Sequence, residues 1–193
     1  MEIFCIGDSL TYGYGVTRSK CWPSLLAATG LSVHNLGVNG DTTGGMLARM
    51  EAQLLSGALK SGDLAFILGG CNDIFCTGAY LTARSSICAM AQQLSSLQIR
   101  PVICTPMGLG PSGYPEAWEE LVDFTAAAEL IRAYNGWLRK FCPAFGLELI
   151  DLEAVFDGFG SRRPELFLDG IHPTAAGHAV IAGVLADFLR GLF

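Results

Sequence analysis

The segment EIFCIGDSL, residues 2–10, sets a pattern that the rest of the chain repeats. Residues 2–6 are apolar after Glu2 and begin almost at the amino terminus of the sequence, and Gly7 ends this run. Such a run is typical of a buried strand in a parallel sheet that is covered on both faces. Ser9 follows at once. In open α/β sheets, functional groups gather just beyond the carboxyl ends of the strands, so Ser9 is a candidate site residue.

Further apolar runs, each bounded by turn residues, alternate with segments of helical spacing. The sequence predicts strands over residues 2–6, 31–36, 63–68, 101–105 and 147–152. It predicts helices over residues 22–28, from a cap at Thr42 or Thr43 to Leu55, over 81–97, over 116–141, and after Pro173. The segments 106–115 and 157–173 are predicted to be loops.

This order of elements indicates the fold class. Strands that alternate with helices are expected to be parallel and joined by right-handed crossovers. We therefore expect an α/β fold, a three-layer α/β/α sandwich, with one domain over residues 1–193. No internal repeat, low-complexity tract or long linker divides the chain.

Composition narrows the class of protein. The chain has 193 residues, of which 51% are hydrophobic and 16% charged, enough for a substantial core. A net charge of −6 argues against binding to nucleic acid or to anionic lipid, because both need a basic surface. No apolar run is long enough to span a bilayer, and no secretory signal is visible, so we expect a cytoplasmic protein without stable membrane insertion. The apolar composition is compatible with a homodimer.

The seven cysteines are odd in number and scattered through predicted strands and helices. Without an export signal, we expect them to be buried, reduced thiols that pack as small hydrophobic groups. No cluster of histidines and cysteines has the spacing of a metal site. The cysteines stand at positions 5, 21, 71, 76, 88, 104 and 142.

A nucleophilic serine needs a base to take its proton and a partner that orients the base. The chain has three histidines, and His172 lies in the segment DGIHP, residues 169–173. Asp169 precedes it by three residues, so one tight loop supplies both the base and its orienting carboxylate. Only neutral imidazole accepts a proton, so activity is expected to rise with pH as His172 deprotonates.

Acyl transfer also needs hydrogen-bond donors for the developing oxyanion. The backbone amide of Gly40, the carboxamide of Asn72 and the backbone amide of Ser9 are suitable donors. Ser9, Gly40 and Asn72 follow the first, second and third predicted strands, and Asp169 and His172 both follow the last one. All five are therefore expected at the same edge of the sheet.

Four short blocks in this order resemble those of the SGNH (GDSL-type) hydrolase family. They are Gly7-Asp8-Ser9-Leu10, Asn39-Gly40-Asp41-Thr42-Thr43, Gly70-Cys71-Asn72-Asp73 and Asp169-Gly170-Ile171-His172-Pro173. Each block alone is a weak signal, but together they span almost the whole chain. The Gly-x-Ser-x-Gly elbow of ordinary α/β-hydrolases is absent from the sequence.

The resemblance implies a role for each matching residue. Ser9 is expected to be the nucleophile and first oxyanion donor, with Gly40 and Asn72 completing the oxyanion hole. His172 is expected to act as general base and then general acid, oriented by Asp169. The family works without a metal or organic cofactor, and its fold is flavodoxin-like, with about five parallel strands in the order 2-1-3-4-5.

Other polar and aromatic residues near these blocks are interpreted as structural. Asp8, Asp41 and Asp73 are expected to accept hydrogen bonds from loop amides, His34 to lie in the core or at a sheet edge, and His178 to be structural or solvent-facing. Two aromatic residues after the glycine-rich loop, Trp118 and Phe124, are candidates for a lid over the acyl group. Cys71 is expected to place a thiol close to the oxyanion hole, where its oxidation would inhibit the enzyme indirectly.

Several functions fit these residues. The leading hypothesis is a small esterase, thioesterase or lysophospholipase that acts through an acyl-serine intermediate, similar to small bacterial members of the family. A carbohydrate O-deacetylase would use the same groups, and the loop over residues 107–124 would distinguish the two. A flavodoxin-like module that binds a flavin or nucleotide is a non-enzymatic alternative, although the first loop lacks the glycine spacing of a phosphate cradle. A second non-enzymatic alternative is a catalytically silent family member that serves only in assembly. The presence of Ser9, Asp169 and His172 argues against this alternative.

Overall fold

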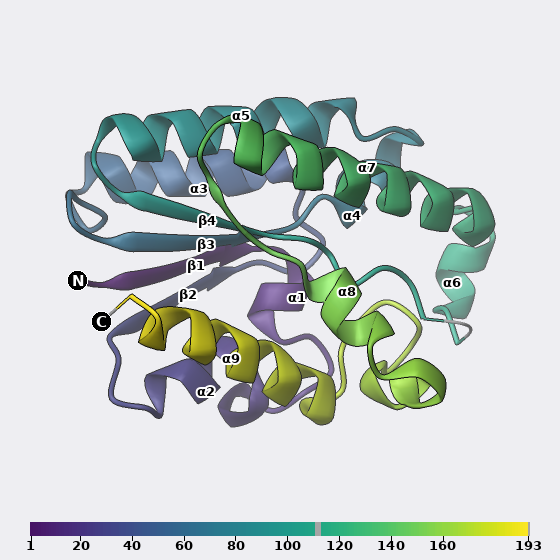
Figure 1. The fold of residues 1–193 in the computed structure, drawn as a ribbon. Helices are drawn as coiled ribbons and strands as arrows, with labels where there is room; N and C mark the ends of the chain where they lie inside the picture. Colours follow the sequence, from purple (N-terminus) through teal and green to yellow (C-terminus); the bar gives the residue numbers. More distant parts are fainter. Residues whose placement is uncertain (111–112, 193) are drawn as a thin grey trace.

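A five-stranded parallel sheet forms the centre of the structure, a computed structural model that describes residues 1–110 and 113–192 (Figure 1). Its strands are β1 (Ile3–Gly7), β2 (Val33–Gly37), β3 (Leu64–Leu68), β4 (Arg100–Cys104) and β5 (Glu148–Ile150). The order across the sheet is β2-β1-β3-β4-β5, and every neighbouring pair is parallel. The predicted number and order of strands are thus confirmed.

The central strands are apolar throughout because both of their faces are covered. Every residue of β1 and β3 is buried, whereas the edge strand β2 is only half-buried along most of its length. Along β1, Phe4 and Ile6 pack into one core, and Ile3 and Cys5 pack into the core on the other face. This alternation is the two-residue period of a strand placed between two layers of helices.

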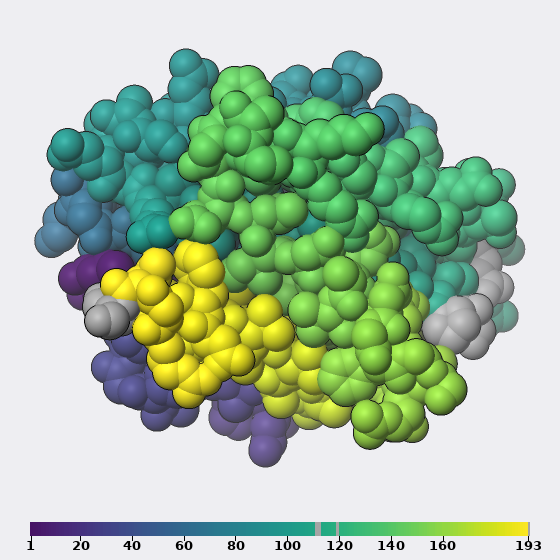
Figure 2. All heavy atoms as spheres, viewed as in Figure 1, coloured from purple at the N-terminus to yellow at the C-terminus, as the bar shows by residue number. Residues whose placement is uncertain are grey.

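The helices cover the two faces as Figure 1 shows. One face is covered by α3 (Thr43–Leu55), α4 (Cys71–Thr77), α5 (Leu81–Ser96) and α7 (Phe124–Ala144). The other face is covered by α2 (Trp22–Ala27), α8 (Leu152–Asp157) and α9 (Ala175–Arg190). Figure 2 shows α7 in the upper half of one side of the molecule and α9 in the lower half. The predicted three-layer sandwich is confirmed.

The predicted helix over residues 116–141 is wrong, because the structure divides it. A short helix, α6 (Glu116–Glu119), is followed by a break, and α7 begins at Phe124. The carboxylate of Asp123 accepts hydrogen bonds from the backbone N–H groups of Thr125 and Ala126, both at 3.0 Å. This side-chain cap starts a new helix inside a segment whose apolar spacing is continuous.

Other short elements were not predicted from apolar spacing. The last strand ends at Ile150 because Asp151 caps α8, accepting from the N–H of Ala154 at 3.1 Å. Of the predicted loop over 106–115, residues 106–110 and 113–115 have no helix or strand, and 111–112 lie outside the described residues. The unpredicted elements are α1 (Ser9–Tyr12), η1 (Arg18–Lys20), α4, α8 and η2 (Gly160–Leu166).

The carboxyl ends of all five strands point to the same side, at the right in Figure 1, where α1, α4, α6 and α8 also lie. In the part of the chain that the structure describes, no helix has both the length and the hydropathy needed to cross a membrane.

Candidate active site

Ser9 is the first residue of α1, a single turn that folds back onto the end of β1. A side chain at Gly7 would collide with the Thr11 hydroxyl and would lie 2.6 Å from the Leu68 carbonyl oxygen. Glycine is therefore required where α1 approaches the strand. Asp8 caps the turn, since its Oδ1 accepts from the N–H of Leu10 at 2.9 Å. These contacts fix the backbone on both sides of Ser9.

The structure brings Ser9 and His172 together from opposite ends of the chain. The Ser9 Oγ lies 3.0 Å from the Nε2 of His172. On the other side of the ring, Nδ1 lies 2.8 Å and 3.0 Å from the two carboxylate oxygens of Asp169. Ser9 and His172 are nearly buried, at 7% and 8% exposed. This line of contacts is the geometry that proton transfer from a serine to an oriented imidazole requires.

Two backbone amides hold the carboxylate of Asp169 in place beside the imidazole. Its Oδ1 accepts from the backbone N–H of His172 at 2.8 Å and from that of Ile171 at 3.1 Å. Burial alone would raise the pKa of Asp169, but the hydrogen bonds from the His172 ring and from these amides outweigh it and lower the pKa. The carboxylate therefore stays charged, which holds the proton of the imidazole on Nδ1.

The predicted oxyanion donors lie beside Ser9. Gly40 has a φ of +72°, and a side chain there would meet no atom within 4 Å, so glycine is required for conformation and not for space. Asn72 is in the first turn of α4, and its Nδ2 donates to the carbonyl oxygen of Asp41 at 2.8 Å. Together with Ser9 and His172 they line a hollow of about 290 Å³, whose described lining residues are Ser9, Tyr14, Asn39, Gly40, Asn72, Pro115, Trp118 and His172.

Tyr14 is a site residue that the sequence did not reveal. Its ring centroid lies 4.3 Å from that of His172, with the two planes tilted by 38°. Gly13 and Gly15 on either side have φ values of +91° and +76°. The Gly-Tyr-Gly triplet was the available signal, because two glycines around one aromatic residue suit a strained loop that presents it.

Of the two candidate lid residues, Trp118 lines the hollow and Phe124 does not. Phe124 is 8% exposed, and its ring stacks on that of Tyr114 with centroids 4.0 Å apart. The expectation that Phe124 covers the acyl group is therefore wrong. Its position in the first turn of α7 directs it into an aromatic cluster that also contains Phe75.

All three aspartates beside the site have structural contacts, but only Asp8 and Asp73 accept from backbone amides as predicted, whereas Asp41 contacts a guanidinium. The carboxylate of Asp73 accepts from the backbone N–H of Thr43 at 2.9 Å and from the Thr43 hydroxyl at 2.8 Å. The carboxylate of Asp41 pairs with Arg49. Asp73 of α4 thus caps α3 in place of a local side chain. Complete burial raises the pKa of Asp8 to about 7.

The other two histidines lie away from the hollow. His34, on the edge strand β2, is exposed and contacts the carboxylate of Glu2 through Nε2 at 2.8 Å. His178 is fully buried in α9, and its Nδ1 accepts from the backbone N–H of Trp22 at 3.4 Å. Both are structural as predicted, and His178 does not face solvent.

Comparison with known proteins agrees with this geometry. The sequence model of the GDSL-like lipase/acylhydrolase family matches residues 5–180. The chain belongs to this family. The expectation of a GDSL-type ester hydrolase is thereby confirmed, and it is favoured over a flavin- or nucleotide-binding module.

The proteins that this chain resembles carry names that describe different substrates. An arylesterase of Vibrio mimicus is 40% identical over 78 residues, an alignment that spans 37% of this chain and 38% of that protein. A G-D-S-L lipolytic protein of Veillonella parvula has the same fold, with a TM-score of 0.78 at 21% identity over 97% of both chains. Est24, a carbohydrate acetylesterase of Sinorhizobium meliloti, has a TM-score of 0.76 at 18% identity, over 100% of this chain and 99% of that one.

Cys71 lies beside Asn72 in this GDSL-family chain, as the sequence indicated. It is 6% exposed, and burial, together with the nearby Asp8, raises the pKa of its thiol well above the ordinary value. A thiol that stays protonated is a poor nucleophile. The expectation that all cysteines are buried is wrong for two of them, because Cys76 is exposed and Cys88 half-buried, although all seven are free.

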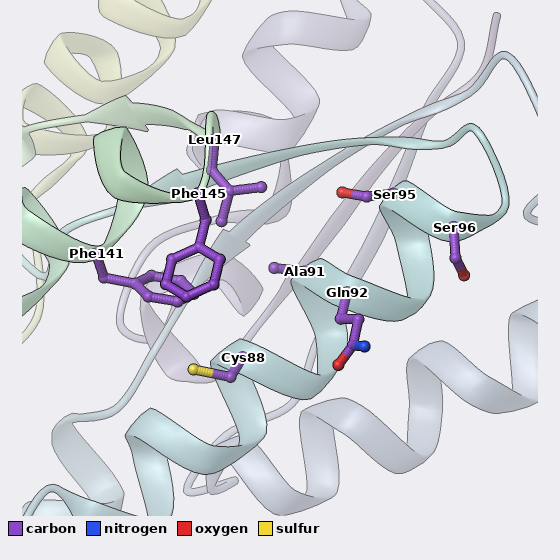
Figure 3. Close-up of a pocket in the computed structure, with 8 residues that line it drawn as sticks. All are labelled: Cys88, Ala91, Gln92, Ser95, Ser96, Phe141, Phe145 and Leu147. Carbon is purple, nitrogen blue, oxygen red and sulfur yellow. The ribbon is translucent and has the colours of Figure 1, made fainter.

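A second hollow, of about 560 Å³, lies between α5 and the end of α7 (Figure 3). The rings of Phe141 and Phe145 form one side, and α5 side chains such as Gln92 form the other. Among the described residues that line it, none is acidic or basic and none is a predicted site residue. Across the described residues, no group of three or more histidine, cysteine or acidic side chains could hold a metal ion.

Proposed function

We propose that this chain hydrolyses esters of short acyl groups through an acyl-Ser9 intermediate. The observation that carries the proposal is the unbroken line of contacts from Ser9 Oγ to His172 Nε2 at 3.0 Å and from His172 Nδ1 to Asp169 at 2.8 Å. It lies at the wall of a hollow that also contains Gly40 and Asn72.

In the proposed reaction, His172 Nε2 takes the proton of Ser9 Oγ as the oxygen attacks the ester carbonyl carbon. The carbonyl oxygen becomes an oxyanion, which accepts hydrogen bonds from the backbone N–H groups of Ser9 and Gly40 and from Nδ2 of Asn72. His172 then gives its proton to the departing alkoxide as the carbon–oxygen bond breaks. Water, deprotonated by the same imidazole, attacks the acyl-serine; the bond from the acyl carbon to Oγ breaks, His172 returns the proton to Ser9 Oγ, and the acid is released.

The size of the hollow favours short acyl groups. Its volume of about 290 Å³ is at the lower end of the usual range for ligand pockets, about 300–1,000 Å³. Tyr14 stands on one side, beside the imidazole, and Trp118 and Pro115 form the apolar side. This space suits an acyl group of a few carbons better than a lipid chain, and the name of the Vibrio mimicus relative, an arylesterase, agrees with a small substrate.

A carbohydrate O-deacetylase is a second candidate, because several hydroxyl side chains line a groove of about 600 Å³ whose lining includes chain neighbours of the oxyanion donors. Its lining includes Thr42 and Asp73, which adjoin Asp41 and Asn72 in the chain. An acetylated sugar could place its acetyl group at Ser9 and its hydroxyls in this groove. The groove's hydroxyl side chains are Thr42, Thr77, Thr82, Ser85 and Ser86.

The proposal is tested by hydrolysis of nitrophenyl esters from acetyl to decanoyl, with acetylated xylose and an acyl-CoA measured beside them. We expect kcat/KM to be highest for acetyl to butyryl esters and to be abolished by Ser9→Ala. The matched control is Ser61→Ala, an exposed serine far along the chain, which should leave the rate unchanged. Equal rates for wild type and Ser9→Ala would refute the serine mechanism, and a preference for decanoyl esters would refute the substrate class.

A further inference from the structure

The guanidinium of Arg49, a residue of α3, contacts three separate points of the chain. Its Nε donates to the carbonyl oxygen of Leu36 at 3.2 Å, and its Nη2 donates to that of Gly7 at 2.8 Å. Its Nη1 pairs with the carboxylate of Asp41. All three nitrogens of the planar group are used, each toward a different segment.

Each of these three points lies within a few residues, along the chain, of Ser9 or Gly40. Gly7 is the last residue of β1 and stands two residues before Ser9. Leu36 is at the end of β2, and Asp41 directly follows Gly40. One guanidinium therefore joins the strand that leads to the nucleophile with the loop that carries the backbone donor.

Asp41 extends this connection to the side-chain donor. Its carbonyl oxygen accepts from Nδ2 of Asn72 at 2.8 Å. A carboxamide nitrogen carries two hydrogens, so this bond fixes the orientation of the amide and leaves the second hydrogen for the oxyanion. Asp41 thus contacts Arg49 through its side chain and Asn72 through its backbone.

The carboxylate of Asp41 occupies a space that a side chain at Gly45 would fill. A side chain at Gly45, in the first turn of α3, would collide with both carboxylate oxygens of Asp41, whereas one at Gly44 would meet only the Thr42 hydroxyl at 3.7 Å. The paired side chains of Asp41 and Arg49 are only 18% and 26% exposed. The pair is therefore partly shielded from water, which strengthens its charge attraction.

We propose that Arg49 is a positioning residue that, through Asp41, holds the oxyanion donors Gly40 and Asn72 in register with Ser9. This inference rests on the proposed function. Oxyanion donors act at about 2.7–3.1 Å, and a misplacement of about 1 Å costs on the order of 100-fold in rate. A lysine at position 49 keeps the charge but cannot contact three points in a plane, so Arg49→Lys is a sensitive variant.

The experiment measures kcat and KM for nitrophenyl acetate and the inhibition constant of a trifluoromethyl ketone, whose adduct with Ser9 carries an oxyanion. For Arg49→Lys we expect kcat to fall roughly 10- to 100-fold. KM should stay within about twofold, and the ketone should bind weaker by the same factor as the loss in kcat/KM. The pH profile should keep its shape, because His172 and Asp169 are not touched.

Two further variants separate positioning from folding. Gly45→Ala displaces the Asp41 carboxylate without removing a charge and should reproduce the loss, whereas Gly44→Ala on the same turn should match the wild type. Arg100→Lys, which weakens an exposed ion pair with Glu148 at the other end of the sheet, is the charge control. Active sites are counted with a fluorophosphonate carried to completion, so that rates refer to folded enzyme.

The inference is overturned if Arg49→Lys and Gly45→Ala both keep kcat and ketone affinity within about twofold of the wild type, whatever their thermal stability. It is also overturned if ketone affinity is unchanged while KM rises, which would place Arg49 in substrate binding. A wild type that hydrolyses no ester would overturn the proposed function itself. The wild-type rate therefore distinguishes the two failures.

Discussion

Two buried groups with displaced pKa values, His178 and Asp8, are expected to change the free energy of unfolding in opposite directions when the protein is acidified. The variant His178→Gln separates the two effects. His178 is fully buried where α9 packs against α2. Burial first, and then the nearby His172, lower the pKa of His178 to about 4, from an ordinary 6.5. Because Nδ1 accepts from the N–H of Trp22, the neutral ring carries its proton on Nε2, which has no hydrogen-bond partner among the described residues. Charging the ring would add a proton to Nδ1 that faces this N–H, so the buried charge would have no compensation.

The sign follows from the direction of this shift. A histidine with a lowered pKa in the folded state contributes stability above pH 6.5 that is lost as pH falls toward 4. Between pH 7.5 and pH 5.0 the loss from His178 is about 2 kcal/mol of unfolding free energy. Glutamine keeps an oxygen that can accept from the N–H of Trp22 and does not titrate, so His178→Gln should remove this loss.

Asp8 acts in the opposite direction. Burial raises its pKa to about 7, from an ordinary 3.8, so the folded state holds a proton that the unfolded state releases. The stability from this proton is fully present below pH 3.8 and is lost as pH rises through 7. Acidification from pH 7.5 to pH 5.0 therefore stabilises the fold by roughly 2.5 kcal/mol through Asp8. The two effects nearly cancel in the wild type.

The assay is urea unfolding at pH 7.5 and pH 5.0, followed by circular dichroism and extrapolated to zero denaturant. We expect a nearly constant free energy for the wild type, a gain on acidification for His178→Gln and a loss for Asp8→Asn. The comparison is the change with pH within each variant, so a uniform cost of substitution drops out. If all three proteins changed by the same amount, within about 0.5 kcal/mol, the assignment of these buried titrations would be refuted.

Three further predictions concern the site. Asn72→Ala should lower kcat for nitrophenyl acetate on the order of 100- to 1,000-fold with little change in KM, and an unchanged kcat would remove Asn72 from the oxyanion hole. Trp118→Ala should raise kcat/KM for octanoyl relative to acetyl esters at least several-fold, because the ring forms a wall of the hollow; an unaltered chain-length profile would contradict this. Cys71→Ser should keep at least about half of the wild-type kcat, since the buried thiol stays protonated, and complete loss of activity in a folded variant would show that the thiol takes part.

Much of the fold was predictable because its signals are local. The apolar runs of β1 and β3 are buried along their whole length, and apolar runs of this kind identify strands without knowledge of tertiary contacts. The division between α6 and α7 was missed because apolar spacing does not show a cap. At Asp123 one carboxylate outweighs a continuous helical pattern by bonding two free N–H groups.

The candidate site was only partly predictable for a similar reason. The positions of Ser9, Gly40, Asn72 and His172 followed from the strands that precede them, and the structure places all four at one hollow. Contacts between side chains that are distant in sequence gave no such signal. The contact of the Tyr14 ring with His172 and the three contacts of Arg49 depend on how loops and α3 pack, which residue spacing does not record.

The central claim, that Ser9 is the nucleophile, is tested most directly by locating a fluorophosphonate adduct by mass spectrometry. We expect one phosphonyl group per chain on the peptide that contains Ser9, bonded to its Oγ with loss of fluoride. Labelling should be abolished in Ser9→Ala, strongly slowed in His172→Gln and unchanged in Ser61→Ala. An adduct on another residue, or equal labelling of the wild type and Ser9→Ala, would contradict the account.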